Sequence, residues 1–167
     1  KNKIEDIKVP IFYCNLIGAQ DELVFDGCSI AFDGRGDCIG QANSFEEDIL
    51  LIDLNDGETF DLDYKPRIQN IFDALCLGIK DYFSKTANTE AVVGLSGGID
   101  SAIVATLACH ALGSENVHGV SMPSKYSSQH SKDDAKQLAI NLEIDYTSIP
   151  IHETVNAIES ALKPKFK

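Results

Sequence analysis

The sequence predicts an α/β protein in which a strand-rich N-terminal part precedes a doubly wound parallel sheet. Three observations lead to this prediction. Residues 9–54 contain short apolar runs separated by turn residues and show no helical repeat. Residues 55–65 are polar and aperiodic. From residue 89 onward, strand-like and helix-like segments alternate, which is typical of a parallel sheet with helices on both faces. We therefore divide the chain into residues 1–54, 55–88 and 89–167.

The N-terminal part is predicted to consist of strands. Residues 9–18 have the composition of one buried strand that ends at a glycine. Residues 23–32 and 38–42 flank the turn-forming cluster 33–37, so we expect a hairpin there. The apolar run at 49–54 predicts a further strand.

Residues 55–88 are expected to form a linker and a connecting helix. Pro66 is placed to begin the helix, because proline is well tolerated in the first helical turn. Apolar residues then recur at helical spacing, which predicts that one face of the helix is buried. The residues of that face are Ile68, Ile71, Phe72, Leu75, Ile79, Tyr82 and Phe83.

The C-terminal part is predicted to alternate strands and helices. The expected strands are residues 91–95, 117–122 and 146–149, and the expected helices are one from Gly98 to Gly113, one over about 131–142 and one over 153–163. In such a sheet, ligands bind at the carboxyl ends of the strands. The segments 94–101 and 122–128 both lie at that edge.

The segment between the first of these strands and its helix is rich in glycine and serine. It reads Gly94-Leu95-Ser96-Gly97-Gly98-Ile99-Asp100-Ser101. A strand, a glycine-rich turn and a helix start together present free backbone N–H groups and the positive end of a helix dipole, which attract phosphate. Ser96 and Ser101 add hydroxyl donors. A carboxylate beside phosphate requires a cation between them, so Asp100 predicts a magnesium ion.

Composition bounds the remaining possibilities. The chain has 167 residues, 44% of them apolar, and a net charge of −12, concentrated in residues 1–60. This charge disfavours a nucleic-acid or membrane-surface binder. The five scattered cysteines are typical of reduced thiols in a cytoplasmic protein. The sequence begins without methionine and stops within an apparent helix, so we expect a fragment of a longer protein.

The glycine-rich segment contains no lysine and is therefore not a Walker A loop. It resembles the SGGxDS pyrophosphate loop of the ATP-pyrophosphatase family. Residues 122–128, 131–135 and 146–151 are similar to a further block of glutamine-dependent NAD synthetases. Residues 15–29 resemble the closing part of a nitrilase-type glutaminase domain, which precedes the synthetase in those enzymes.

This resemblance implies an adenine nucleotide α-hydrolase-like sheet preceded by the end of an αββα nitrilase-like sandwich. It implies an enzyme that amidates deamido-NAD to NAD with ATP, magnesium and ammonia from glutamine, and that forms homo-oligomers through the synthetase domain. By position, Ser96, Gly97, Gly98, Asp100 and Ser101 would hold pyrophosphate and magnesium. Gly94, Leu95 and Ser96 would lie near the ribose, and the backbone of Met122 would meet the adenine.

The glutamate, lysine and cysteine of the family's glutaminase site lie upstream of residues 15–18 in that family and have no counterpart in this chain. We therefore assign no catalytic residue here, and we expect Cys14 and Cys28 to be buried apolar residues in strands. Lys125 is placed either to contact phosphate or to be solvated, and the sequence leaves both open.

Two other functions fit parts of the sequence. One is another amidating or thiolating enzyme with the same loop, such as a GMP or asparagine synthetase. The other is an adenine-nucleotide-binding module without chemistry. Asp100 favours an enzyme, because a simple binder does not need a carboxylate that bridges magnesium to pyrophosphate.

Overall fold

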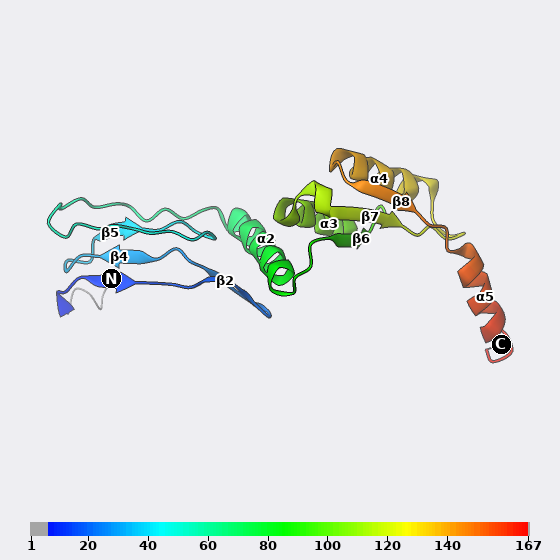
Figure 1. The fold of residues 1–167 in the computed structure, drawn as a ribbon, viewed down its shortest axis with the longest axis horizontal. Coiled ribbons are helices and arrows are strands. Elements are labelled where there is room, and N and C mark those ends of the chain that lie inside the picture. The colour runs from blue at the N-terminus through cyan, green and yellow to red at the C-terminus, as the bar shows by residue number, and fades with distance from the viewer. Residues whose placement is uncertain (1–6, 167) are drawn as a thin grey trace. The chain divides into compact units, whose positions relative to one another are not determined.

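The computed structural model describes residues 7–166, and the chain divides into two compact units, Lys1–Tyr82 and Phe83–Lys167 (Figure 1). Within the described residues, no helix combines the length and apolar character needed to cross a bilayer. The two units are described separately below.

The first unit contains antiparallel strands. Its three-stranded sheet has the order β1-β4-β5, and its two-stranded hairpin pairs β2 with β3. The strands are β1 (Ile11–Tyr13), β2 (Ile17–Gln20), β3 (Leu23–Asp26), β4 (Ile30–Phe32) and β5 (Cys38–Gln41). The predicted hairpin around residues 33–37 is confirmed, because β4 and β5 pair on either side of that turn.

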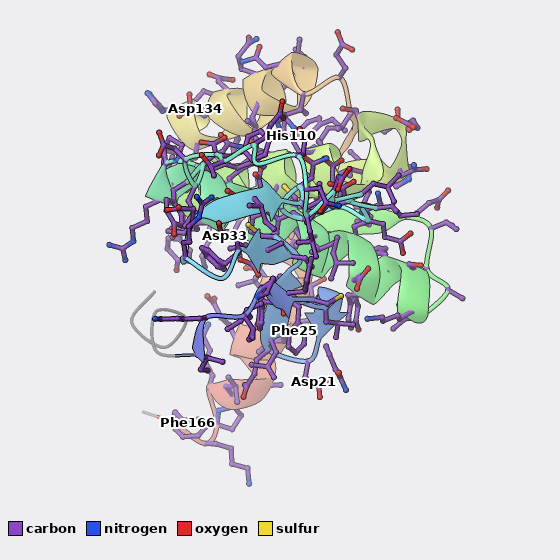
Figure 2. The ribbon with its side chains drawn as sticks, turned by 90° about the vertical axis from the view of Figure 1, so that its left-hand side faces the viewer. Asp21, Phe25, Asp33, His110, Asp134 and Phe166 are labelled. Carbon is purple, nitrogen blue, oxygen red and sulfur yellow. The ribbon has the colours of Figure 1, made fainter. Side chains whose placement is uncertain are left out.

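A single carboxylate closes the turn between β4 and β5. Asp33, labelled in Figure 2, accepts hydrogen bonds from the backbone N–H groups of Arg35 and Asp37, both at 2.9 Å, and from Nε of Arg35 at 2.8 Å. The hydrogen bond from Arg35 lowers the pKa of Asp33. An aspartate that bonds to backbone groups a few residues ahead is a common way to fix a turn.

The prediction of one buried strand over residues 9–18 is wrong. The segment forms β1 and β2, which pair with β4 and β3 respectively. The opposite chain explains the break, because Gly27 and Cys28 have φ values of +65° and +48° and cannot continue an extended strand. The strand is also not buried, since the side chain of Phe12 is 58% exposed.

The prediction of a strand at residues 49–54 is also wrong. This segment has no ladder partner among the described residues, and Ile49 and Leu51 are 89% and 91% exposed. Leu50 and Ile52 instead lie against Gly40 of β5, where an added Cβ would come within 2.8–3.0 Å of them. Side-chain packing on a sheet therefore replaces backbone pairing at this point.

The connecting helix α2 (Arg67–Lys85) begins directly after Pro66, as predicted. The prediction of a buried face is wrong, because none of its residues is buried and Ile68 is 75% exposed. One of its contacts within the first unit is made by Asp81, whose Oδ2 accepts from the backbone N–H of Ala19 at 2.6 Å. The amphipathic repeat identified the helix correctly, but the described residues of this unit leave much of its apolar stripe exposed.

The second unit is a three-stranded parallel sheet with the order β6-β7-β8. Its elements are β6 (Ala91–Gly94), α3 (Ile99–Leu112), a 3-10 turn (Ser114–Asn116), β7 (Val117–Ser121), α4 (Gln129–Asn141), β8 (Asp145–Ser148) and α5 (His152–Leu162). The predicted alternation is confirmed, and each boundary lies within a few residues of its expected position. Gly113 ends α3 with a φ of +88°, as its place after the helix predicted.

The core of the second unit lies on one face of this sheet. Alanines of α3 and α4 meet apolar residues of the strands and their ends there in one cluster. Its members are Val93, Leu95, Ala105, Ala108, Val117, Ala135, Ala139 and Ile144. Helices on both faces were predicted, and among the described residues α3 and α4 both pack on one face. The strand order contains no reversal, so two right-handed crossovers place α3 and α4 on the same side. Val92, on the opposite face, is 71% exposed.

Candidate functional site

The segment that joins β6 to α3 makes a tight turn whose shape depends on one glycine. Gly97 has a φ of +81°, which disfavours residues with a side chain. A Cβ at this position would overlap the backbone oxygen of Ser131 and lie 2.7 Å from its Cα. The turn is therefore packed directly against the first turn of α4, and glycine is required on both counts.

The N-terminus of α3 opens onto this turn. Gly98 is the N-cap residue, and no side chain caps the helix there. The first helical bond runs from the N–H of Ala102 to the oxygen of Gly98 at 3.2 Å. The N–H groups of Ile99, Asp100 and Ser101 in the first helical turn have no internal helical acceptor, so this end of α3 carries free donors and partial positive charge.

Two serine hydroxyls are held beside these donors. Ser96 Oγ accepts from the N–H of Gly98 at 3.2 Å and lies 3.1 Å from Ser101 Oγ. Ser101 Oγ also donates to the oxygen of Gly98 at 3.0 Å and accepts from the N–H of Ser96 at 3.3 Å. The two hydroxyls thus fix the turn from both ends, while Ser96 remains exposed and Ser101 is half-buried.

Asp100 lies in the first turn of α3 and is exposed. Its carboxylate makes no hydrogen bond or ion pair with any residue in the range 7–166. Within the same range, no group of three or more His, Cys, Asp or Glu residues is arranged to hold a metal ion. Asp100 is therefore a single free carboxylate beside a set of hydrogen-bond donors.

A cavity of about 240 Å³ lies at the carboxyl ends of β6 and β7. Four predicted site residues line it, namely Gly94, Leu95, Ser96 and Met122. The structure thus brings the ends of two strands together, as the sheet topology required. The predicted residues that do not line it are Gly97, Gly98, Ile99, Asp100 and Ser101, which form the adjoining turn and helix start.

The residues of the cavity contribute in different ways. The side chain of Leu95 is only 2% exposed and belongs to the core, and its N–H donates to the oxygen of Val120 at 2.8 Å. Only backbone atoms of Leu95 are therefore available to a ligand. Met122 is 54% exposed and lies beside Gly94, where an added Cβ would make an ordinary van der Waals contact of 3.9 Å with the Met122 Cε.

The structure places Lys125 in an ion pair on the surface and not at the cavity. Its Nζ lies 3.1 Å from both carboxylate oxygens of Glu159 and 5.0 Å from the centre of the Tyr126 ring. The hydrogen bond with Glu159 raises the pKa of Lys125. Lys125 does not line the cavity.

Sequence reasoning missed several residues of this cavity. The first turn of α4 supplies Ser131 and Lys132, and the preceding loop supplies Ser127. The sequence signal that could have identified these residues is the position of their segment in the chain. It follows the second strand, and Ser128 Oγ accepts from the N–H of Ser131 at 3.1 Å as an N-cap, which fixes where α4 begins.

The expectation that Cys14 and Cys28 are buried strand residues is wrong. Cys14 is exposed and Cys28 is half-buried, and both lie in the breaks between strands. Cys28 Sγ accepts a hydrogen bond from Nε2 of Gln41 at 3.2 Å. No described cysteine takes part in a disulfide.

Comparison with known proteins identifies the family. Residues 71–167 match the family model described as NAD synthase. A glutamine-dependent NAD(+) synthetase from Synechocystis sp. is 44% identical over 95% of this chain. The structure of a glutamine-dependent NAD(+) synthetase from Acinetobacter baumannii in complex with ADP superimposes on 99% of the chain with a TM-score of 0.91 and 33% identity. An NH3-dependent NAD synthetase structure from Campylobacter jejuni covers 59% of the chain with a TM-score of 0.51 and 34% identity.

The chain spans about a third of the length of these glutamine-dependent relatives, 30% of the Synechocystis protein and 32% of the Acinetobacter chain, and 42% of the Campylobacter chain. These relatives agree with the interpretation of the chain as part of an NAD synthetase. They do not agree with the two alternatives, a GMP or asparagine synthetase and a binding module without chemistry. The match includes the loop, the cavity and the helices on either side. The chain therefore belongs to the NAD synthase family.

Proposed function

We propose that the protein carrying this chain is an ATP-dependent ligase that amidates deamido-NAD to NAD with ammonia derived from glutamine. The nicotinate carboxylate attacks the α-phosphate of ATP, and pyrophosphate leaves. Ammonia then attacks the carbonyl carbon of the adenylate, and AMP leaves. The observation that carries the proposal is the uncapped start of α3 beside two fixed serines, in a chain of this family.

The turn from Ser96 to Ser101 is proposed to bind the pyrophosphate part of ATP. Free N–H groups at a helix start, two hydroxyls and the backbone of Gly97 and Gly98, which carries no side chain, form an anion-binding arrangement. The hydrogen bonds among Ser96, Gly98 and Ser101 hold these donors in place before the ligand arrives. Adenylyl transfer depends mainly on such positioning and charge neutralisation.

The cavity next to the turn is proposed to hold the adenosine part of ATP. Gly94, Leu95 and Ser96 would lie at the ribose, and backbone atoms of Met122 would meet the adenine. The cavity joins the turn at Ser96 and measures about 240 Å³, so it offers space for part of a nucleotide. In support, the structure of the Acinetobacter protein is a complex with ADP.

Magnesium is proposed to bind at Asp100. Magnesium commonly uses one or two carboxylates together with substrate phosphates and water, and Asp100 offers one exposed carboxylate with no competing partner among residues 7–166. When bound, the ion would neutralise charge on the departing pyrophosphate. Ile99, which is 72% exposed beside Asp100, would border the phosphate site through its backbone.

The N-terminal strands are proposed to close a nitrilase-like αββα glutaminase domain, with domain boundaries at residues 1–54, 55–88 and 89–167. Glutamine-dependent relatives cover 95–99% of the chain, whereas the NH3-dependent structure covers 59%, a share close to the family-model match that begins at residue 71. This difference supports a glutamine-specific role for the front part. No catalytic glutaminase residue is proposed among residues 1–54.

The parallel strands are proposed to be one wing of a doubly wound, adenine nucleotide α-hydrolase-like sheet. Among residues 7–166, β6 pairs on one side only, and Val92, on the face opposite the core, is 71% exposed. Both features are expected of a sheet that continues with further strands and helices. Cytoplasmic location and homo-oligomers through the synthetase part complete the proposal.

A test of the function is the release of pyrophosphate from ATP by the full-length protein. We expect release that requires deamido-NAD and magnesium, and NAD formation that requires glutamine or ammonia. Release that depends instead on a GMP precursor or on aspartate would contradict the proposal, as would ATP binding without any turnover.

A further inference from the structure

Lys132 is a cation at the cavity that has no partner within the described chain. It lies in the first turn of α4 and lines the same cavity as Gly94, Leu95 and Ser96. Its side chain makes no ion pair or hydrogen bond with residues 7–166. Lys65 and Lys125 behave differently, because they pair with Asp73 at 2.9 Å and with Glu159 at 3.1 Å.

The acidic residues nearest to Lys132 in sequence are engaged elsewhere. Asp133 accepts from Nε2 of Gln129 at 2.8 Å, and Asp134, labelled in Figure 2, lies 2.7 Å from Nδ1 of His130. Lys132 is nevertheless half-buried. A lysine can bury its methylene stem while its ammonium stays in water, so the Lys132 ammonium is available to an anion at the cavity.

The turn proposed to bind phosphate has no positively charged side chain of its own. No lysine or arginine lies within residues 94–101, so the turn contributes only neutral donors and one negative carboxylate. The turn and the start of α4 are in direct contact, since Gly97 has no room for a Cβ beside Ser131. Lys132 follows Ser131 in the first turn of α4 and lines the cavity that adjoins the turn at Ser96.

We propose that Lys132 binds the phosphate chain of ATP and supplies the positive charge that the turn itself does not carry. This inference rests on the proposed function, because it assigns a further substrate-contacting residue to the same site. The ligand class is a nucleoside polyphosphate or pyrophosphate, and adenosine without phosphates is not expected to sense the residue.

The test uses the full-length protein and the variant Lys132→Gln. We expect the KM for ATP and the inhibition constant of pyrophosphate to rise about tenfold or more, since a charge-assisted hydrogen bond is lost. The affinity for adenosine should stay within about twofold, and Lys132→Arg should retain most of the ATP affinity. Lys136→Gln removes the same charge from the exposed next turn of α4 and should behave as the wild type.

An unchanged KM for ATP in Lys132→Gln would overturn the inference, as would an equal loss of affinity for ATP and adenosine. Equilibrium binding of ATP and pyrophosphate separates this outcome from failure of the proposed function. If the wild type binds ATP but shows no turnover that depends on deamido-NAD, the function fails, and the difference in binding between Lys132→Gln and the wild type still decides the role of Lys132. If Lys132→Gln loses its fold, Lys132→Met, which removes the charge but keeps a long side chain, is measured instead, and an unchanged ATP affinity in that variant would overturn the inference.

Discussion

We expect Asp100 to matter for turnover and not for the fold. A carboxylate next to a phosphate site weakens anion binding unless a cation joins the two. We predict that Asp100→Asn leaves the fold intact and lowers turnover on the order of 100-fold, because charge neutralisation of the leaving group is worth several kcal/mol. Pyrophosphate release measured across a magnesium titration tests this prediction.

The matched control for Asp100 is Asp145→Asn. Asp145 begins β8, at the amino end of that strand and thus at the edge opposite the cavity, and its side chain is 89% exposed. The same loss of charge there should leave turnover and its magnesium dependence unchanged. Equal activity of Asp100→Asn and the wild type at limiting magnesium would remove the metal role from Asp100.

Gly97 and Gly57 offer a matched pair for the cost of the tight turn. Both have positive φ, at +81° and +73°, but an added Cβ meets the backbone of Ser131 only at Gly97, and nothing lies within 4 Å at Gly57. We predict that Gly97→Ala lowers the free energy of unfolding by about 2–4 kcal/mol, from backbone strain and overlap together. Gly57→Ala should cost about 1 kcal/mol, from backbone conformation alone.

Urea unfolding of the full-length protein and its variants measures both values. A small and equal loss in the two variants would mean that α4 moves aside without cost, and that the turn is not held by its contact with Ser131.

At the scale of the element, the start of α2 is tied to the segment before it by one aspartate. Asp73 accepts hydrogen bonds from Lys65 Nζ at 2.9 Å and from Gln69 Nε2 at 2.7 Å. The hydrogen bond with Lys65 lowers the pKa of Asp73. A lowered carboxyl pKa adds stability that is fully present above the unfolded-state value of about 4 and is lost as the pH falls through the folded-state value.

We therefore predict that Asp73→Asn is less stable than the wild type at pH 7 by about 0.5–1 kcal/mol, as is typical of partly exposed ion pairs. The difference should shrink as the pH falls below about 4, where the wild-type carboxylate becomes protonated. Thermal unfolding of both proteins from pH 7 to pH 3 measures this. A difference that is independent of pH would show that packing, not charge, fixes the start of α2.

The elements of the second unit could be predicted from sequence because each local signal agreed with the fold. Gly113 and Ser128 mark the end of α3 and the start of α4, and the one strand between them is β7, which carries Val117 and Val120. Residues 49–54 show the limit of this reasoning, because an apolar run does not reveal whether its backbone finds a partner strand. Likewise, the periodicity of α2 identifies a helix but not the surface that covers it.

The candidate site was predictable to a similar extent. The turn at residues 94–101 was visible because strand, glycines and helix start are adjacent in sequence. Lys132 was not, because its place at the cavity depends on how α4 packs against Gly97, a contact between segments far apart in the chain. The loop position of Lys125 suggested a possible phosphate contact. Its actual partner, Glu159, lies 34 residues away and could not be identified from the local sequence.

At the scale of the whole molecule, many large apolar side chains of the described chain face solvent. Ile49 and Leu51 are about 90% exposed, and Val92, Ile68 and Ile99 exceed 70%. Such exposure is unusual for a protein that functions alone. Together with the partial coverage of its relatives, it is the pattern expected if further chain packs on these surfaces in the full-length protein.

We predict that a segment of residues 7–166 produced alone binds the dye ANS strongly, whereas the full-length protein does not, because ANS reports accessible apolar surface. Fluorescence titration of both at equal concentration measures the difference. Equally weak binding by the two would mean that the segment covers its own apolar residues.

The central claim is that the turn from Ser96 to Ser101 holds the terminal phosphates of ATP. A crystal structure of the full-length protein with a non-hydrolysable ATP analogue and magnesium tests it most directly. We predict phosphate oxygens within hydrogen-bonding distance of the N–H groups at the start of α3 and of the hydroxyls of Ser96 and Ser101. A nucleotide bound elsewhere, with this turn in contact with none of its phosphates, would contradict the claim.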